Sequence, residues 1–240
     1  MMRKLNVLKP GTIFEYAGHE FVVLDEKDGG VLVLQAKSDE SLPYNDNREG
    51  NLNDFRTSSI KEYLNGGYLE SLIQNGAKEG DILDLTIDLK ATDGSRAYGY
   101  DTVKVGLLTL EQYGQYKEII PLNEDDWWWL ATPWATPWLR SPYTNDTGSA
   151  WHVNTDGDSY YNYVTHSVGS RPALLLNPLL LVSVKGEETP SNTAWSEYIE
   201  YLIHWTVTHA DDAYSGMSPA CYDEWLDNCE GDDFDDEEDE

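Results

Sequence analysis

The most restrictive feature of this sequence is a block of 28 residues, Tyr143 to Ser170, whose composition differs from that of the chain on either side. The block consists of Tyr, Asn, Asp, Ser, Thr, His, Gly and Val with one Ala and one Trp, and it lacks Lys, Glu, Gln, Arg, Leu, Ile, Met and Phe. Tyr provides a large contact area at low entropic cost, while Asn, Ser and Gly provide adaptable hydrogen bonding. The composition therefore indicates a binding surface rather than a core or a catalytic cleft.

Apolar segments flank this block on both sides. Three consecutive tryptophans begin at Trp127, two Thr-Pro-Trp units follow, and Arg171 to Asn177 closes the stretch with an apolar run. We expect the tryptophans to form a buried framework, with Arg140 and Arg171 donating hydrogen bonds to loop carbonyls, because a guanidinium group can satisfy several acceptors.

The charge of the chain is strongly asymmetric. A length of 240 residues fits one or two domains, and residues 187–240 hold 18 of the 44 acidic residues and none of the 16 basic ones. Without a basic patch, binding to a nucleic-acid backbone is not expected. The same acidity disfavours an anionic membrane surface.

The N-terminal sequence has no continuous apolar region of the kind found in signal peptides, and no stretch reaches the length of a membrane span. We therefore expect synthesis in the cytoplasm and no membrane insertion, and association with a virion stays open. The two cysteines, Cys221 and Cys229, do not make a closed zinc site, and we expect reduced thiols. No metal and no cofactor are predicted.

The pattern of the chain before the block predicts an α+β fold with short antiparallel strands and two main helices. Apolar runs separated by Ala17-Gly18 and Asp28-Gly29-Gly30 predict hairpins within residues 12–36. Thr109 with Gln112 forms a capping-box pattern for a helix from Leu110 to Ile119. The remaining expectations are a loop over 38–53, a helix over 58–74 broken at Gly66-Gly67, a strand or connector over 82–89, a strand over 101–108, and a buried pair of strands over 172–177 and 179–184.

Within the block, residues 150–154 and 160–164 flank Thr155-Asp156-Gly157-Asp158, and Asp-Gly between two strand-like runs predicts a hairpin. Asn154, Asp156 and Asp158 alternate as calcium ligands do, but Ser159 and Thr165 stand where an EF-hand loop requires Gly and Glu. We therefore favour the turn over a metal site.

The C-terminal part of the chain has a different character. Residues 187–229 read as a linker with an amphipathic helical tail, in which residues 194–209 place Trp195, Tyr198 and Leu202 at helical spacing. Such a face packs on a core or docks another protein. The last eleven residues, 230–240, contain nine acids and are expected to be a disordered acidic tail.

Catalytic signatures are scarce in this sequence. It has no nucleophile elbow, Walker loop, zinc-protease helix or dinucleotide fingerprint, and its five histidines form no metal-ligand pattern. His152 and His166 lie inside the tyrosine-rich block, where a surface contact fits better than general-base work. The prediction is a protein that is not an enzyme.

Several motifs resemble the C-type-lectin-fold variable proteins of diversity-generating retroelements in bacteria and phages, which are related in fold to the formylglycine-generating enzymes. In that family a Trp-Trp-Leu-Arg-Ser-Pro block leads into a variable segment and an Arg-Pro-Ala-Leu block closes it. The matching residues here are Trp129-Leu130, Trp138-Leu139-Arg140-Ser141-Pro142 and Ser170-Arg171-Pro172-Ala173-Leu174, with similar entry segments at 56–65 and 101–111.

The resemblance implies that the block is hypervariable. Mutation of adenines in Asn codons yields the residue types found in 143–170, with Trp151 left as framework. The positions expected to vary and to bind the ligand are Tyr143, Asn145, Asp146, His152, Asn154, Asp156, Asp158, Tyr160, Tyr161, Tyr163, Thr165 and His166.

The resemblance further implies a C-type-lectin-like ligand-binding domain over residues 1–186, with a protein or glycan ligand on a cell surface. Two alternatives stay open: a calcium-independent carbohydrate-binding lectin, and an enzyme of the formylglycine-generating type, whose paired cysteines or His-rich iron site do not appear in this domain. Two features depart from the family pattern: the doubled Thr-Pro-Trp unit at 132–138 and the acidic tail after residue 186, which we expect to dock another protein.

Overall fold

A computed structural model describes residues 2–46, 51–78, 80–124, 126–136, 147–185 and 198–205. The chain divides into two compact units, one formed by residues 2–186 and the other by residues 187–240 with Met1. In the second unit the described residues, 198–205, are helical, and the rest of the predicted tail lies outside the described residues.

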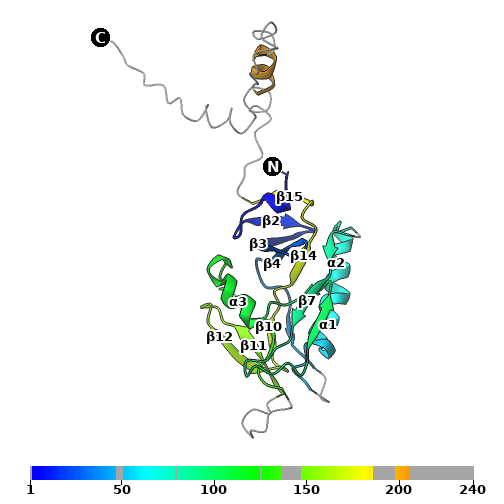
Figure 1. Cartoon of the computed structure of the whole chain (residues 1–240), viewed down its shortest axis with the longest axis vertical. Helices are drawn as coiled ribbons and strands as arrows, with labels where there is room; N and C mark the ends of the chain where they lie inside the picture. The colour runs from blue at the N-terminus through cyan, green and yellow to red at the C-terminus, as the bar shows by residue number, and fades with distance from the viewer. Residues whose placement is uncertain are drawn as a thin grey trace, which may run out of the picture. The chain divides into compact units, whose positions relative to one another are not determined.

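The first unit is a mixed α/β domain built on mostly antiparallel sheets (Figure 1). The larger sheet has the order β1-β15-β2-β3-β4-β14-β6, and β9 also pairs with β14. The first described strand therefore pairs with the last one, because Arg3 lies opposite Val182. The strands are β1 (Met2–Lys4), β2 (Ile13–Tyr16), β3 (His19–Lys27), β4 (Gly30–Gln35), β6 (Ile82–Leu83), β9 (Val105–Gly106), β14 (Ala173–Leu176) and β15 (Leu181–Val184).

Two tight turns join β2, β3 and β4, as the sequence predicts. Ala17 and Gly18 have φ values of 46° and 81°, and Asp28 and Gly29 have values of 51° and 76°. Positive φ at both central residues matches the right-handed twist of the strands that such turns connect. The predicted hairpins within residues 12–36 are confirmed.

A second sheet has the order β12-β11-β10-β13-β5, in which only β10 and β13 run parallel. Its strands are β5 (Ser41–Pro43), β10 (Trp128–Pro133), β11 (Ser149–Val153), β12 (Ser159–Tyr163) and β13 (Ser167–Gly169). A two-stranded sheet joins β7 (Leu85–Asp88) to β8 (Tyr100–Val103). The prediction of one strand over 101–108 is wrong, since the chain turns at Lys104 and continues in a different sheet as β9.

The helical segments begin where side chains cap them. α1 (Ser59–Tyr63) starts after Ser58, whose hydroxyl accepts the Lys61 amide. α2 (Leu69–Gln74) continues the same rod, because Gly66 and Gly67 lie in a π-helical turn, Leu64–Tyr68, rather than in the predicted break. α3 (Leu110–Tyr116) carries the predicted capping box and ends in a 3-10 turn, Lys117–Ile119.

Two further expectations need correction. The predicted surface loop over 38–53 contributes β5 and the fully buried residues Tyr44 and Asn53, while residues 47–50 lie outside the described residues. β15 is only half buried, because Leu181 is 57% exposed, although the sequence predicts a buried strand. Its side chains alternate between exposed and buried along the strand, so one of its faces meets solvent.

The core lies between the larger sheet, the helices and β10. β4, β14 and β10 are buried along their whole lengths. Such strands are continuous apolar runs because both faces are covered. This core fixes β10, against which α3 packs and from which the neighbouring strands β11 and β12 extend to the sheet edge (Figure 1).

Candidate ligand-binding surface

The β11–β12 hairpin lies at the edge of the second sheet and contains most of the described part of the tyrosine-rich block. Trp151 lies opposite Tyr161, and His152 lies opposite Tyr160. The turn between the strands closes with a hydrogen bond from the Asn154 amide to the Asp158 carbonyl, and Gly157 has φ of +80°. The predicted hairpin is confirmed, with each strand shifted by one residue toward the N-terminus.

One face of the hairpin carries a stack of three aromatic rings. Because residues directly opposite in an antiparallel pair share a face, Trp151 and Tyr161 point the same way. Trp134, which follows β10, stacks on Tyr161 with 3.9 Å between ring centroids, and its ring lies 5.1 Å from that of Trp151. Tyr161 is 51% exposed, so the outer face of the stack is open to a ligand.

The other face of the hairpin is only partly open. Tyr160 is 54% exposed there, whereas His152 is 2% exposed and packs between the rings of Trp127 and Trp129. Burial lowers the pKa of His152, although its hydrogen bond with Asn154 opposes this shift. The expectation that His152 contacts a ligand is wrong, since its ring lies beneath the surface as framework.

The remaining described positions of the expected site lie at the two ends of the hairpin. Asn154, Asp156 and Asp158 form the turn, where the Asp156 side chain accepts the Asp158 amide and Lys117 lies 3.5 Å from Asp158. The Asp156 carboxylate therefore serves the turn itself, whereas the side-chain oxygen of Asn154 lies 2.8 Å from Nε2 of His152. At the other end, on either side of the buried Val164, the exposed positions of the expected site are Tyr163, Thr165 and His166.

Tyr163 and His166 form a second, smaller aromatic contact, with ring centroids 5.7 Å apart. Nδ1 of His166 also lies 2.8 Å from the side-chain oxygen of Asn162. This contact continues the aromatic face along β12, because Tyr163 lies two residues beyond Tyr161. Tyr143, Asn145 and Asp146, together with Arg140, lie outside the described residues.

Residues of the rest of the domain hold the hairpin by donating hydrogen bonds to main-chain carbonyls in it and next to it. The Tyr113 hydroxyl donates to the Gly157 carbonyl at 2.6 Å, and the Asn53 side chain donates to the Ser149 carbonyl at 2.9 Å. The amide of Asn45 donates to the Val164 carbonyl at 3.0 Å. Since these three contacts end on backbone carbonyls, they do not depend on the identity of the exposed side chains of the hairpin.

Arg171 anchors the framework below. It is fully buried, and its guanidinium donates to the carbonyls of Gln35, Ala36 and Pro121 at 2.8–3.0 Å and lies 4.9 Å from the Trp128 ring. Burial lowers its pKa to about 10. The expected hydrogen bonds to backbone carbonyls exist, but they hold residues 35–36 and 121 rather than the tyrosine-rich block.

A pocket of about 220 Å³, which the sequence does not reveal, has among its lining residues Thr92, which contacts Trp134 and Trp151 of the aromatic stack. Three separate segments contribute to it: the end of β7 with the residues after it, the start of α3, and Thr132 of β10. Its lining residues are Asp88, Lys90, Ala91, Thr92, Thr109, Leu110, Glu111 and Thr132.

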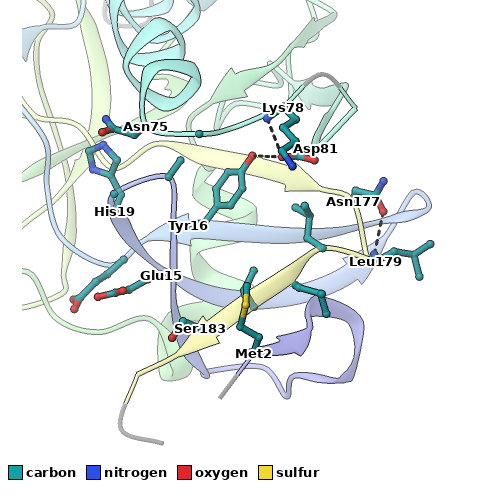
Figure 2. A pocket seen from close by; sticks show the side chains of 17 residues that line it. Met2, Glu15, Tyr16, His19, Asn75, Lys78, Asp81, Asn177, Leu179 and Ser183 are labelled. Carbon is teal, nitrogen blue, oxygen red and sulfur yellow. Dashed lines mark hydrogen bonds between the residues drawn. The ribbon is translucent and has the colours of Figure 1, made fainter. Parts of the chain in front are cut away.

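A broader groove of about 760 Å³ lies on the larger sheet. Figure 2 shows Tyr16 in its middle with the hydroxyl directed to Asp81, which also accepts the Lys78 amide. Burial raises the pKa of Tyr16, as does the carboxylate of Asp81. Glu20, another lining residue, forms an ion pair with Lys185, so much of the polar lining is already engaged with protein groups.

Metal and membrane signals are absent from the part of the chain that the structure describes. No group of three or more His, Cys, Asp or Glu side chains in that part is arranged to hold a metal ion. No helix there is long and apolar enough to cross a membrane.

The geometry defines a mixed α/β domain that presents an aromatic hairpin at the edge of its second sheet. The chain belongs to the family described as a domain of unknown function, DUF6273, whose model matches residues 28–178 and therefore more than half of the chain. The match extends from the β3–β4 turn to the residue after Asn177 and includes the whole hairpin. No curated protein and no solved structure matches the chain.

Proposed function

We propose that this protein is a non-enzymatic recognition protein whose β11–β12 hairpin and adjoining residues form a diversified, tyrosine-rich ligand-binding surface. In this proposal the domain is a C-type-lectin-like variable protein of a diversity-generating retroelement, and its ligand is a protein or glycan on a cell surface. The motif resemblance around residues 129–142 and 170–174 supports this assignment.

The way the scaffold holds the hairpin is the observation that carries the proposal. Tyr113, Asn53 and Asn45 all belong to segments outside 143–170, and all three contact main-chain carbonyls of the hairpin region. Replacement of the exposed side chains leaves these three hydrogen bonds in place, because their acceptors are main-chain carbonyls.

Exposure of the expected positions gives further support. Apart from His152, every described position of the set is at least partly exposed, and Tyr160, Tyr161 and Tyr163 are 51–62% exposed. Exposed tyrosines on a rigid strand bind with little loss of side-chain entropy, which favours recognition. Such an arrangement serves binding rather than a chemical step.

Two experiments test the proposal. The first is sequencing of the gene in many copies from one population, in which we expect substitutions to concentrate at codons 143–170 and to spare codons such as those of Trp128 and Trp129. An even distribution of substitutions along the gene would contradict diversification.

The second experiment measures adhesion of the purified full chain to cells and to arrayed surface proteins and glycans. Replacing Tyr160, Tyr161 and Tyr163 together by Ala is expected to abolish binding. The matched control is Tyr100→Ala, since Tyr100 is 60% exposed on β8, outside the block. Equal binding by the triple variant and the control would contradict the assigned surface.

A further inference from the structure

The pocket beside the aromatic stack has a composition that points to a ligand class. Thr92 connects the two features: its hydroxyl donates to the Trp134 carbonyl at 3.0 Å and lies 3.4 Å from the indole nitrogen of Trp151. Thr92 also lines the pocket. A ligand that covers the outer face of Tyr161 therefore has the pocket within reach along the same side of the sheet.

The polar groups of the pocket are suited to hydroxyl groups. One side-chain oxygen of Asp88 is bonded to Arg96, while its other oxygen is buried and has no hydrogen-bond partner among the described residues. Lys90 and Glu111 add an ammonium and a carboxylate, and Thr109 and Thr132 add hydroxyls. Because that second oxygen is closed to solvent, a ligand hydroxyl can form charge-assisted hydrogen bonds only with the Asp88 oxygen that is bonded to Arg96 and with the carboxylate of Glu111.

This combination of groups excludes two other ligand classes. An apolar lipid would leave Asp88, Lys90 and Glu111 desolvated without partners. A nucleic acid would bring phosphates against two carboxylates, in a chain with a net charge of −28. A sugar ring fits both the aromatic stack and the pocket. Its C–H bonds carry partial positive charge and favour the negative face of an aromatic ring, and its hydroxyls can donate to and accept from the polar groups of the pocket.

We propose that the ligand is a glycan, with one sugar ring on the Tyr161–Trp134 stack and its hydroxyls in the pocket formed by Asp88, Lys90 and Glu111. This inference rests on the proposed function of the hairpin and names its ligand class. The pocket lies outside the block expected to vary, so every version of the protein binds the same sugar unit there. The hairpin, which is expected to vary, then determines which adjoining sugar units of the glycan are bound.

The test is binding of the purified full chain to an array of defined oligosaccharides, followed by affinity measurements with the bound compounds. Tyr161→Ala is compared with Ile73→Ala, because Ile73 is similarly exposed, at 58%, but lies on α2, outside both the hairpin and the pocket. We expect about tenfold weaker binding for Tyr161→Ala and less than about twofold change for Ile73→Ala. Glu111→Gln and Asp88→Asn, which preserve side-chain shape, are expected to weaken binding by about tenfold with an unchanged thermal midpoint for Glu111→Gln.

The outcomes separate this inference from the function on which it rests. If the protein binds no oligosaccharide on the array but binds a surface protein through the hairpin, the glycan inference is wrong and the recognition function still holds. Sugar binding that survives both Tyr161→Ala and Glu111→Gln would overturn the assigned subsite. Absence of hairpin-dependent binding to cells, proteins and glycans alike would overturn both.

Discussion

β10 and β12 belong to the same sheet, are separated only by β11, and are both rich in aromatic residues, yet they use them in opposite ways. Trp128 and Trp129 on β10 are at most 1% exposed, whereas Tyr161 and Tyr163 on β12 are 51% and 62% exposed. The tryptophans have neighbours on both sides of the sheet, and the tyrosines lie at its edge. An aromatic residue on β10 thus contributes to stability, and one on β12 is available for binding.

The strongest test of this difference is Trp129→Ala. Trp129 is fully buried, donates its indole N–H to the Leu42 carbonyl and packs edge-on against Tyr44. Its removal leaves a large cavity, and we expect the free energy of unfolding to fall by about 3–5 kcal/mol. Urea denaturation measures this loss, and a decrease no larger than that of Tyr160→Ala would refute the framework role.

Arg171→Lys is expected to have the next largest effect. A lysine ammonium cannot reproduce the fork that serves the carbonyls of Gln35, Ala36 and Pro121, so buried acceptors lose their donors. The expected loss of stability is about 2–3 kcal/mol. Arg56→Lys is the control, because Arg56 is 40% exposed and its pair with Asp54 should contribute less than about 1 kcal/mol.

Asn53→Ala tests the link between the framework and the hairpin. The Asn53 amide donates to the carbonyls of Ala135 and Ser149, and its oxygen accepts the Tyr98 hydroxyl. Its loss leaves buried groups unpaired, which costs about 1–3 kcal/mol. Hydrogen exchange should accelerate in β11 and β12 more than in β3 and β4; uniform acceleration would show that Asn53 does not act on the hairpin in particular.

The burial of His152 predicts a smaller, pH-dependent contribution to the free energy of unfolding. Burial holds its folded-state pKa below the ordinary value of 6.5, so folding favours the neutral ring. Its contribution is complete above pH 6.5 and is lost as the pH falls through the folded-state pKa. Urea midpoints between pH 7.5 and pH 5 should fall less for His152→Phe than for the native protein, whereas identical pH profiles would exclude this group.

The smallest expected effect on stability comes from Tyr163→Ala. Tyr163 is 62% exposed and its main contact is the ring of His166, so the free energy of unfolding should change by less than about 0.5 kcal/mol. Ligand binding should weaken nevertheless. A large loss of stability on thermal unfolding would place Tyr163 with the framework instead of the binding surface.

Local chemistry predicts much of the fold from the sequence. The positive-φ turns at Ala17-Gly18 and Asp28-Gly29, the capping box at Thr109 and the hairpin around Gly157 each depend on residues a few positions apart. These features are readable because their causes lie within one turn or one helix end.

The candidate site is only partly predictable. The hairpin follows from local sequence, whereas the aromatic stack and the pocket are assembled from segments that lie far apart in the chain. Trp134 joins Tyr161 across the sheet, and the pocket draws Asp88, Lys90 and Glu111 from two further elements. No pattern of neighbouring residues in the sequence predicts these contacts. One feature of the sequence could have indicated the burial of His152. Neighbouring residues in a strand point to opposite faces of the sheet, so either Trp151 or His152 had to face inward.

The position of β12 at the edge of its sheet has a consequence for how the protein behaves in concentrated solution. Within the described residues β12 pairs on one side only, so its free backbone groups can template the addition of a strand from another molecule. Tyr and Thr favour strands, and ladders of Asn and stacked aromatic rings stabilise such pairing, so the residue types of this surface do not themselves prevent it. The charged residues between Tyr143 and Ser170 are all aspartates, Asp146, Asp156 and Asp158, and repulsion between the carboxylates of two copies opposes the pairing.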